Sequence, residues 1–87
     1  MKITIADIAI QKLLDSSRKG FVSSDVRFLK EVFRSAVNRR VMKKDDTNWR
    51  GRVMQGLITS ERFNRVKSGK FHVYNIKMNK DGTIWRE

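Results

Sequence analysis

The sequence predicts a small α+β domain in which three amphipathic helices are followed by a β-hairpin. Apolar residues recur at helical spacing in three separate segments before Thr59. Beyond that point the pattern changes to strand-like alternation, and a basic turn containing Gly69 divides the alternating segment in two. The 87-residue chain has no Pro-rich or Ser-rich linker and no internal repeat, so we expect one domain over residues 1–87.

The first helix is predicted over Ile5–Asp15. Thr4 suits the N-cap position, and Asp7 stands three residues later, where a capping box needs an acceptor side chain. The polar segment after this helix ends at Gly20, which we expect to reverse the chain with a positive φ. The apolar pair Phe21-Val22 then predicts a brief strand.

The second helix is predicted over Asp25–Asn38, with a serine of the Ser23-Ser24 pair as its cap. Its apolar residues recur at i, i+3, i+7, i+10 and i+11, which predicts a buried stripe on one face. The residues of this stripe are Val26, Leu29, Phe33, Ala36 and Val37.

The third helix is predicted over residues 47–59, with Asp46 or Thr47 as its cap. At 100° per residue, Trp49, Val53 and Leu57 fall on one apolar stripe. The opposite face carries the polar residues Asn48, Arg52, Gln55 and Thr59, with Gly51 between them. Two interpretations of the helical glycines stay open. Either Gly56 allows close packing and Gly51 the close approach of a partner, or the helix ends near Gly56.

The C-terminal third predicts a hairpin over Arg62–Met78, with its turn at residues 67–70. A second turn signal, Asn79–Gly82, precedes Thr83–Arg86, which we expect as a third strand. Three aromatic residues of the hairpin, Phe63, Phe71 and Tyr74, are candidates for exposed stacking surfaces.

Charge is the strongest feature of the composition. Twenty Lys and Arg against nine Asp and Glu give a net charge of +11, spread along the chain. Such an excess favours a polyanion as partner, and nucleic acid over an acidic protein or a membrane surface. The absence of cysteine excludes disulfides and thiolate metal sites and is typical of a reducing compartment. With no signal peptide or segment of transmembrane length, we expect a cytoplasmic location, at the nucleoid or in a host nucleus if the protein is viral.

No pattern in the sequence predicts a catalytic site, so we expect neither an enzyme nor a bound cofactor or metal. The single histidine, His72, lies in a predicted strand and suits packing better than acid–base chemistry. Asp45 and Asp46 form an acidic pair, but adjacent carboxylates before a helix are more typical of caps than of a metal site. The helical glycines lack the context of a phosphate-binding loop.

The order of helix, brief strand, helix, loop, helix and basic hairpin resembles the winged helix-turn-helix family. The likeness rests on Phe21–Asp25, on the third helix, and on the Gly56-Leu57-Ile58 run into the hairpin. The resemblance implies a third helix in the major groove and a hairpin, the wing, on the DNA backbone. Two departures are the length of the second helix and the connection of about seven residues after it, where this motif has a tight turn.

The resemblance also implies roles for individual residues. Asn48, Arg52 and Gln55 would read base edges. The implied backbone and wing contacts are Arg39, Arg40, Lys43, Lys44, Arg50, Thr59, Arg65, Lys67, Ser68 and Lys70.

We therefore expect a sequence-specific binder of double-stranded DNA, a small transcription regulator acting as a monomer or homodimer. So short a chain leaves no room for an effector domain, which favours repression by occlusion and suits a phage-encoded protein. Two alternatives stay open. One is a non-specific DNA or RNA binder that stacks bases on its aromatic residues. The other is an interaction module that contacts a host protein or the transcription machinery and inhibits a nucleic-acid enzyme.

Overall fold

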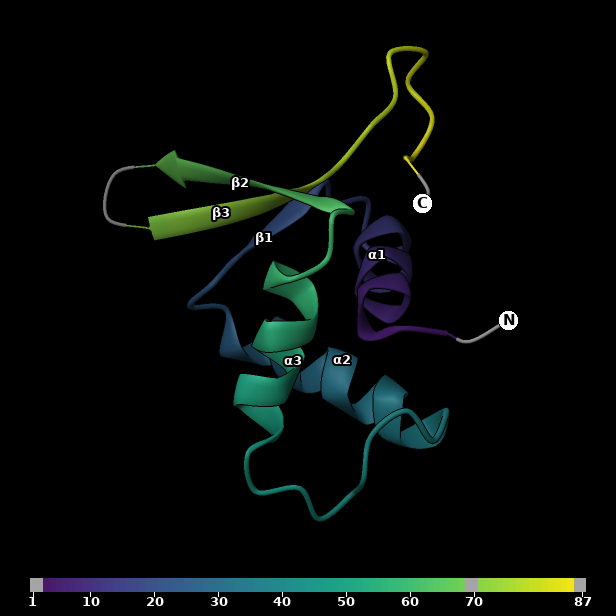
Figure 1. Ribbon diagram of the computed structural model, residues 1–87, viewed down its shortest axis with the longest axis vertical. Coiled ribbons are helices and arrows are strands. Elements are labelled where there is room, and N and C mark those ends of the chain that lie inside the picture. Colours follow the sequence, from purple (N-terminus) through teal and green to yellow (C-terminus); the bar gives the residue numbers. More distant parts are fainter. Residues whose placement is uncertain (1–2, 69–70, 86–87) are drawn as a thin grey trace.

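The computed structural model describes residues 3–68 and 71–85, which form a small α+β domain (Figure 1). Within these residues there are three helices and one three-stranded antiparallel sheet. The elements in chain order are α1 (Ile5–Asp15), β1 (Gly20–Val22), α2 (Val26–Asn38), α3 (Trp49–Ile58), β2 (Phe63–Ser68) and β3 (Phe71–Ile76). The predicted fold class is confirmed at this level. None of the helices described has the length and apolar character that crossing a membrane requires.

Helix α1 has the predicted bounds and the predicted capping box. The Asp7 N–H donates to the Thr4 hydroxyl oxygen at 3.2 Å, and the Thr4 N–H donates to Asp7 Oδ2 at 3.0 Å. Two of the unpaired N–H groups at the start of the helix are thereby satisfied. A four-residue sequence pattern was enough to predict this helix start.

The chain leaves α1 through Ser17, and the predicted reversal at Gly20 is wrong. Ser17 has a left-handed φ of 55°. The Arg18 N–H donates to the Leu13 carbonyl at 2.8 Å and the Ser17 N–H to the Leu14 carbonyl at 3.0 Å. These two bonds form a Schellman motif, whose left-handed position is usually occupied by glycine.

Gly20 lies instead in β1, where it allows close approach to β3. It pairs with Asn75, and a Cβ at this position would lie 2.3 Å from Asn75 Oδ1 and 2.5 Å from the Tyr74 carbonyl oxygen. The sheet has the order β1-β3-β2. Its third strand is therefore β1. Of the predicted third strand at Thr83–Arg86, residues 83–85 form no strand of this sheet, and Arg86 lies outside the described residues.

The chain after β3 forms a turn with a single β-bridge between Met78 and Ile84. The Thr83 hydroxyl donates to Asp81 Oδ1 at 2.6 Å, and the Thr83 N–H donates to the same oxygen at 3.0 Å. These hydrogen bonds, that of the hydroxyl first, lower the pKa of Asp81. Local polar bonds thus order this turn in place of a longer strand pairing.

Helix α2 begins one residue later than predicted and has a different cap. The Phe28 N–H donates to Asp25 Oδ1 at 3.1 Å, so Asp25 is the N-cap and neither serine is. The buried face consists of Phe28, Leu29, Val32 and Ala36. Of the predicted stripe, Leu29 and Ala36 are buried and Phe33 is half-buried against the core, while Val37 is half-buried and Val26 is 39% exposed. The stripe is therefore correct for Leu29, Phe33 and Ala36, and it misses Phe28 and Val32.

Phe21 is the centre of the core and is 1% exposed. Its ring stacks on Phe28 of α2 at 5.0 Å and on Tyr74 of β3 at 5.3 Å, measured between ring centroids. Phe63 of β2 meets it edge-on at 5.5 Å. Each aromatic pair of this kind stabilises the fold by about 0.5–1.5 kcal/mol beyond the contribution of its buried area.

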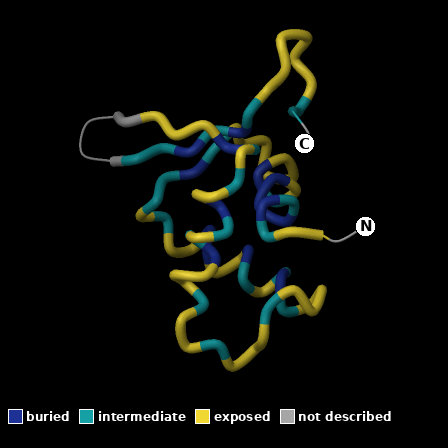
Figure 2. The backbone as a smooth tube through the Cα atoms, viewed as in Figure 1, coloured by how far each residue is buried: buried dark blue, intermediate teal, exposed yellow. Residues whose placement is uncertain are grey.

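The helices lie on one side of the sheet, and the β2–β3 hairpin projects beyond them (Figure 1). Buried residues are concentrated where α1, α2, α3 and the inner parts of the strands meet (Figure 2). The outer part of β2 and the connection between α2 and α3 are largely exposed (Figure 2). The outer end of the hairpin and the outer side of α3 thus face away from the core.

Candidate nucleic-acid interface

Helix α3 has one buried and one polar exposed face, as predicted. Val53 and Leu57 are fully buried at 0% exposure. On the other side, the side chains of Asn48, Arg52 and Gln55 are exposed. Because the apolar side is committed to the core, these polar side chains are held outward on a rigid element.

The start of α3 differs from the predicted cap. Asn48 is the N-cap residue, and its side chain makes no capping hydrogen bond. Asp46 Oδ1 accepts a hydrogen bond from the Asn48 N–H at 2.9 Å. Asp46 Oδ2 forms an ion pair with Arg52 Nε at 2.7 Å, and the Arg52 side chain is 67% exposed. The amide of Asn48 is therefore not used for capping, while Arg52 is held by an acid from the preceding loop.

The end of α3 carries two further exposed side chains. The Thr59 hydroxyl donates its proton to the Gln55 carbonyl at 2.6 Å, so it is left as an acceptor only. Ile58 is 45% exposed on the same end of the helix. Ile58 is not among the residues that the sequence predicts for the exposed face of this helix.

The two helical glycines have different surroundings. A Cβ at Gly56 would lie 3.0 Å from Ile5 Cδ1, so this residue allows α3 to pack closely on α1. A Cβ at Gly51 would meet nothing within 4 Å. The helix ends at Ile58, two residues past Gly56, so Gly56 lies in its last turn and also allows the close packing that was the other interpretation. Gly51 leaves the helix backbone open on the exposed side.

The hairpin places Arg65 on the face of the sheet that covers the helices. Arg65 pairs directly with Tyr74, whose side chain is buried in the core, and residues directly opposite each other share a face. Arg65 itself is exposed. Lys70 and the side chains of Lys67 and Ser68 lie outside the described part of the structure.

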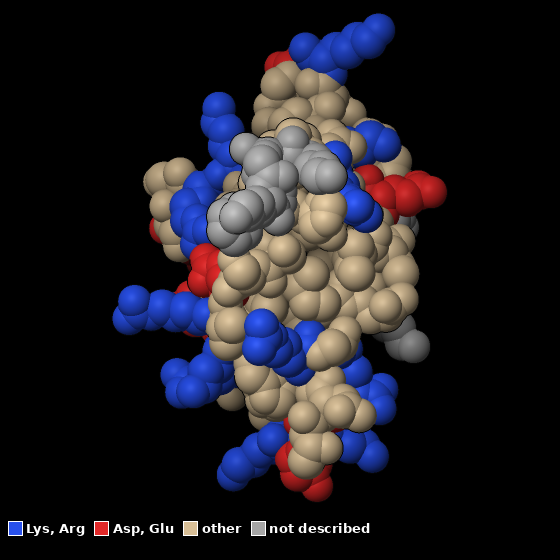
Figure 3. Space-filling model, turned by 90° about the vertical axis from the view of Figure 1, so that its left-hand side faces the viewer, with Lys and Arg blue, Asp and Glu red and all other residues tan. Residues whose placement is uncertain are grey.

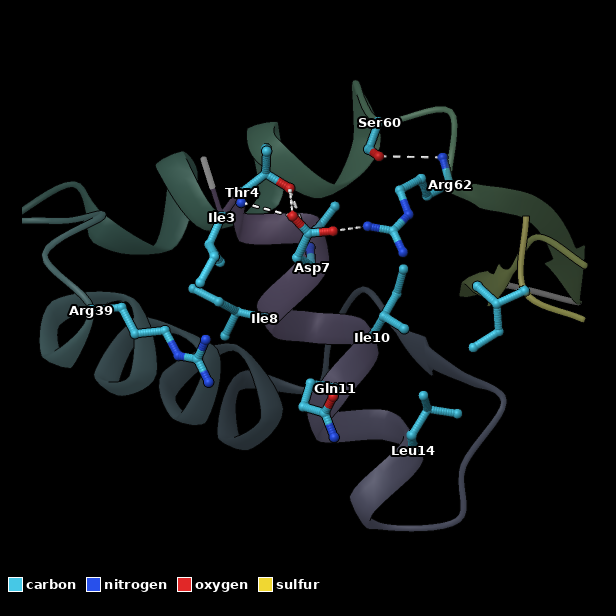
Figure 4. Close-up of a pocket in the computed structure, with 13 residues that line it drawn as sticks. Ile3, Thr4, Asp7, Ile8, Ile10, Gln11, Leu14, Arg39, Ser60 and Arg62 are labelled. Atoms are coloured by element: carbon cyan, nitrogen blue, oxygen red, sulfur yellow. Dashed lines mark hydrogen bonds and ion pairs between the residues drawn. The ribbon is translucent and has the colours of Figure 1, made fainter. Parts of the chain in front are cut away.

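The basic connection after α2 is divided between two sides of the molecule. Arg40 has a left-handed φ of 60° and ends α2 in a second Schellman motif, in which the Val41 N–H donates to the Ala36 carbonyl at 2.8 Å. Arg39 points toward α1, on the other side of that helix from Arg62 at the start of the hairpin (Figure 4). Lys43 and Lys44 are exposed on the path from there to α3. Arg39 is therefore not brought together with the predicted base readers.

Arg39 lines an open hollow of about 780 Å³ beside α1. Apolar side chains, among them Ile8 and Leu14, share this hollow with polar ones (Figure 4). Asp7 forms an ion pair there with Arg62, whose side chain is only 14% exposed. The Asp7–Arg62 ion pair thus closes the hollow on one side and joins α1 to the start of the hairpin.

Figure 3 shows the face toward which the hairpin projects. Lys and Arg side chains stand around much of its margin and in its lower part, while Asp and Glu side chains are fewer. Uncharged residues fill its centre. A face with a positive margin and an uncharged centre is suited to a partner with a negatively charged backbone on both sides of a groove.

Comparison with protein-family models, curated proteins and solved structures finds no match for this chain.

Two of the three aromatic residues proposed for base stacking are core residues. Phe63 is 8% and Tyr74 is 6% exposed, so neither ring can receive a base. Phe71 has no described side chain. His72 is half-buried, and its Nδ1 is buried without a hydrogen-bond partner among the residues described. No three His, Cys, Asp or Glu side chains within residues 3–68 and 71–85 are grouped so that they could hold a metal ion.

Proposed function

We propose that this protein is a sequence-specific double-stranded DNA-binding protein of the winged helix-turn-helix kind, acting as a small transcription regulator. The observation that carries the proposal is the exposed row of Asn48, Arg52 and Gln55 on a helix whose opposite side is fully buried. A helix of about 10–12 Å diameter fits a major groove about 12 Å wide. In this arrangement α3 lies in the major groove with its polar side toward the base edges.

The chemistry of the exposed row suits base edges. The amides of Asn48 and Gln55 can pair with adenine, and a guanidinium can pair with guanine. Exposed Ile58 offers an apolar contact for a thymine methyl group. Gly51 leaves room for the edge of the groove to approach the helix backbone. Each bidentate contact of this kind is worth about 1–3 kcal/mol of discrimination between bases.

The basic side chains near α3 suit the DNA backbone. Arg50 is exposed in the first turn of α3, Lys43 and Lys44 precede the helix, and Arg65 lies on the hairpin. With a net charge of +11, such contacts release counterions and make affinity strongly dependent on salt. The order of elements and the β1-β3-β2 sheet agree with the hairpin serving as the wing.

One helix and one hairpin bury little surface for high specificity, so the protein would bind as two copies on a repeated site. Occupation of an operator by so small a protein would repress transcription by occlusion.

The proposal is tested by measuring affinity for a mixed-sequence duplex over a range of salt concentrations. Arg65→Ala and Lys43→Ala should each reduce the slope of log K against log salt by about 0.9, the contribution of one phosphate contact. Lys12→Ala, on α1, removes the same charge away from this face and should leave the slope nearly unchanged. Failure of the wild-type protein to bind duplex at about 150 mM salt would contradict the proposal, as would equal effects of all three substitutions.

A further inference from the structure

The ion pair between Asp46 and Arg52 joins the loop before α3 to the exposed row on that helix. Asp46 Oδ2 lies 2.7 Å from Arg52 Nε. The two residues are at i and i+6 in the sequence, so the contact is not one of the usual i, i+3 or i, i+4 helical pairs. It exists because the chain bends back over the first turn of α3.

Asp46 is held on several sides and so forms a fixed support. Its side chain is 17% exposed. Its Oδ1 accepts from the Asn48 N–H, and its carbonyl oxygen accepts from the Trp49 N–H at 3.3 Å. The Trp49 ring in turn stacks on Phe33 of α2. The position of the carboxylate is therefore set by the backbone at the start of α3 and, through Trp49, by the core.

Arg52 keeps most of its hydrogen-bonding capacity when Asp46 is bound. A guanidinium has five N–H donors in one plane, and the ion pair brings Asp46 Oδ2 close to Nε, not to either terminal nitrogen. The four donors of the two terminal nitrogens remain, and the plane is now oriented by the carboxylate. Two parallel donors at the end of an oriented guanidinium match the O6 and N7 acceptors of guanine.

We propose that Asp46 is a positioning residue that presents the end of Arg52 to a guanine, so that the target site contains a G·C pair at this position. The inference rests on the proposed DNA-binding function and adds to it the base that is read and the residue that orients the reader. Without Asp46, Arg52 would be free to contact a phosphate as readily as a base.

The charge of Asp46 makes the inference testable. A carboxylate near DNA repels phosphates, so its removal alone should strengthen binding to any sequence. Loss of a positioning contact should weaken binding to the guanine-containing site only. Asp46→Asn keeps an oxygen that can accept from the Asn48 N–H, so the start of the helix is preserved. Asp45→Asn is a matched control, because Asp45 is an exposed neighbour with no ion pair among the described residues.

The experiment first selects duplexes from a random pool with the wild-type protein and then measures affinity of the variants for the selected site and for an unrelated duplex. We expect Asp46→Asn to lose about tenfold in affinity on the selected site, the value of one weakened bidentate contact. Asp45→Asn should bind that site at least as tightly as wild type. On the unrelated duplex the two variants should have the same affinity as each other, at least as high as that of wild type. Adding Asp46→Asn to Arg52→Ala should cost nothing further, because the two residues act together.

Several results would overturn the inference while the proposed function stands. One is a selected site in which no guanine loses its preference in Arg52→Ala. Another is an Asp46→Asn variant with the same affinity for the selected site as Asp45→Asn. A third is a double variant whose loss of affinity is the sum of the two single losses. A wild-type protein that selects no site would end both proposals. A measurement without DNA provides an independent test. NMR relaxation should show the Nε–H of Arg52 to be more ordered than the Nε–H of Arg50 in the wild type. In Asp46→Asn the two groups should be equally mobile. Equal mobility in the wild type would contradict the positioning role.

Discussion

The rings of Phe33 in α2 and Trp49 in α3 stack with their centroids 5.0 Å apart and their planes 22° from parallel. Both residues are half-buried, at the edge of the core. The contact fixes the first turn of α3 against α2 despite the long connection between the two helices. It therefore takes the place of a tight turn in setting the direction of α3.

Replacing Trp49 with Ala should loosen α3. Loss of a half-buried indole and its stacking partner should lower the free energy of unfolding by about 2–3 kcal/mol, less than the 3–5 kcal/mol typical of a fully buried aromatic residue. Denaturant unfolding measures the change. Phe33→Ala should have a similar effect, and the double variant should lose less than the sum of the two. Additive losses would show that the stack does not couple the helices.

Gly51→Ala should stabilise the protein and weaken its binding to DNA. Alanine gains about 0.5–1 kcal/mol over glycine in a helix, and a Cβ at this position meets nothing within the protein. The same methyl group would stand between the helix and the edge of the groove. Thermal unfolding and affinity for a selected duplex measure the two effects. Unchanged affinity with raised stability would show that no partner approaches α3 at Gly51.

Gly20→Ala should destabilise the sheet. The added Cβ would collide with the Tyr74 carbonyl, a backbone atom that cannot move without disturbing the β1–β3 pairing. We expect a loss of about 1–3 kcal/mol, the usual cost of overpacking. Gly56→Ala is the comparison, because its Cβ would meet the Ile5 side chain at 3.0–3.4 Å and would not collide with a backbone atom. Equal stability of the Gly20→Ala variant and wild type would contradict the observed approach of the two strands.

Ser17→Gly should raise stability. Ser17 is exposed and has a φ of 55°, a conformation that costs an L-residue roughly 1–2 kcal/mol and glycine almost nothing. Because glycine also loses more entropy on folding, the net gain should be up to about 1 kcal/mol. Ser16, with a φ of −94°, is the control, and Ser16→Gly should destabilise. A Ser17→Gly variant that unfolds more readily than wild type would argue against the left-handed conformation.

The elements with strong local signals could be predicted from the sequence. The capping box of α1 and the Trp49, Val53 and Leu57 stripe of α3 depend on residues three or four apart, so local spacing determines them. The hairpin also follows from a local pattern, and β2 and β3 lie within the predicted range Arg62–Met78, but the predicted turn is too long because Lys67 and Ser68 are paired in β2.

Features that depend on tertiary contacts could not be predicted. Helix α2 offers two overlapping apolar stripes, and the stack of Phe21 on Phe28, from a strand outside the helix, selects the one that is buried. Both Schellman motifs place a non-glycine residue in the left-handed position, so the usual glycine signal was missing. The contact of Asp46 with Arg52 follows no helical period, which is why Asp46 was taken for a cap.

The central claim is that the exposed side of α3 reads DNA sequence. Selection from a random-sequence duplex pool at about 150 mM salt tests it most directly, with the wild type compared with Arg52→Ala, Gln55→Ala and the distant control Lys12→Ala. The account predicts one enriched motif for the wild type and the control, with the Arg52 and Gln55 variants each losing preference at a different position of it. Binding without any enriched motif, or a motif unchanged in both α3 variants, would contradict the claim.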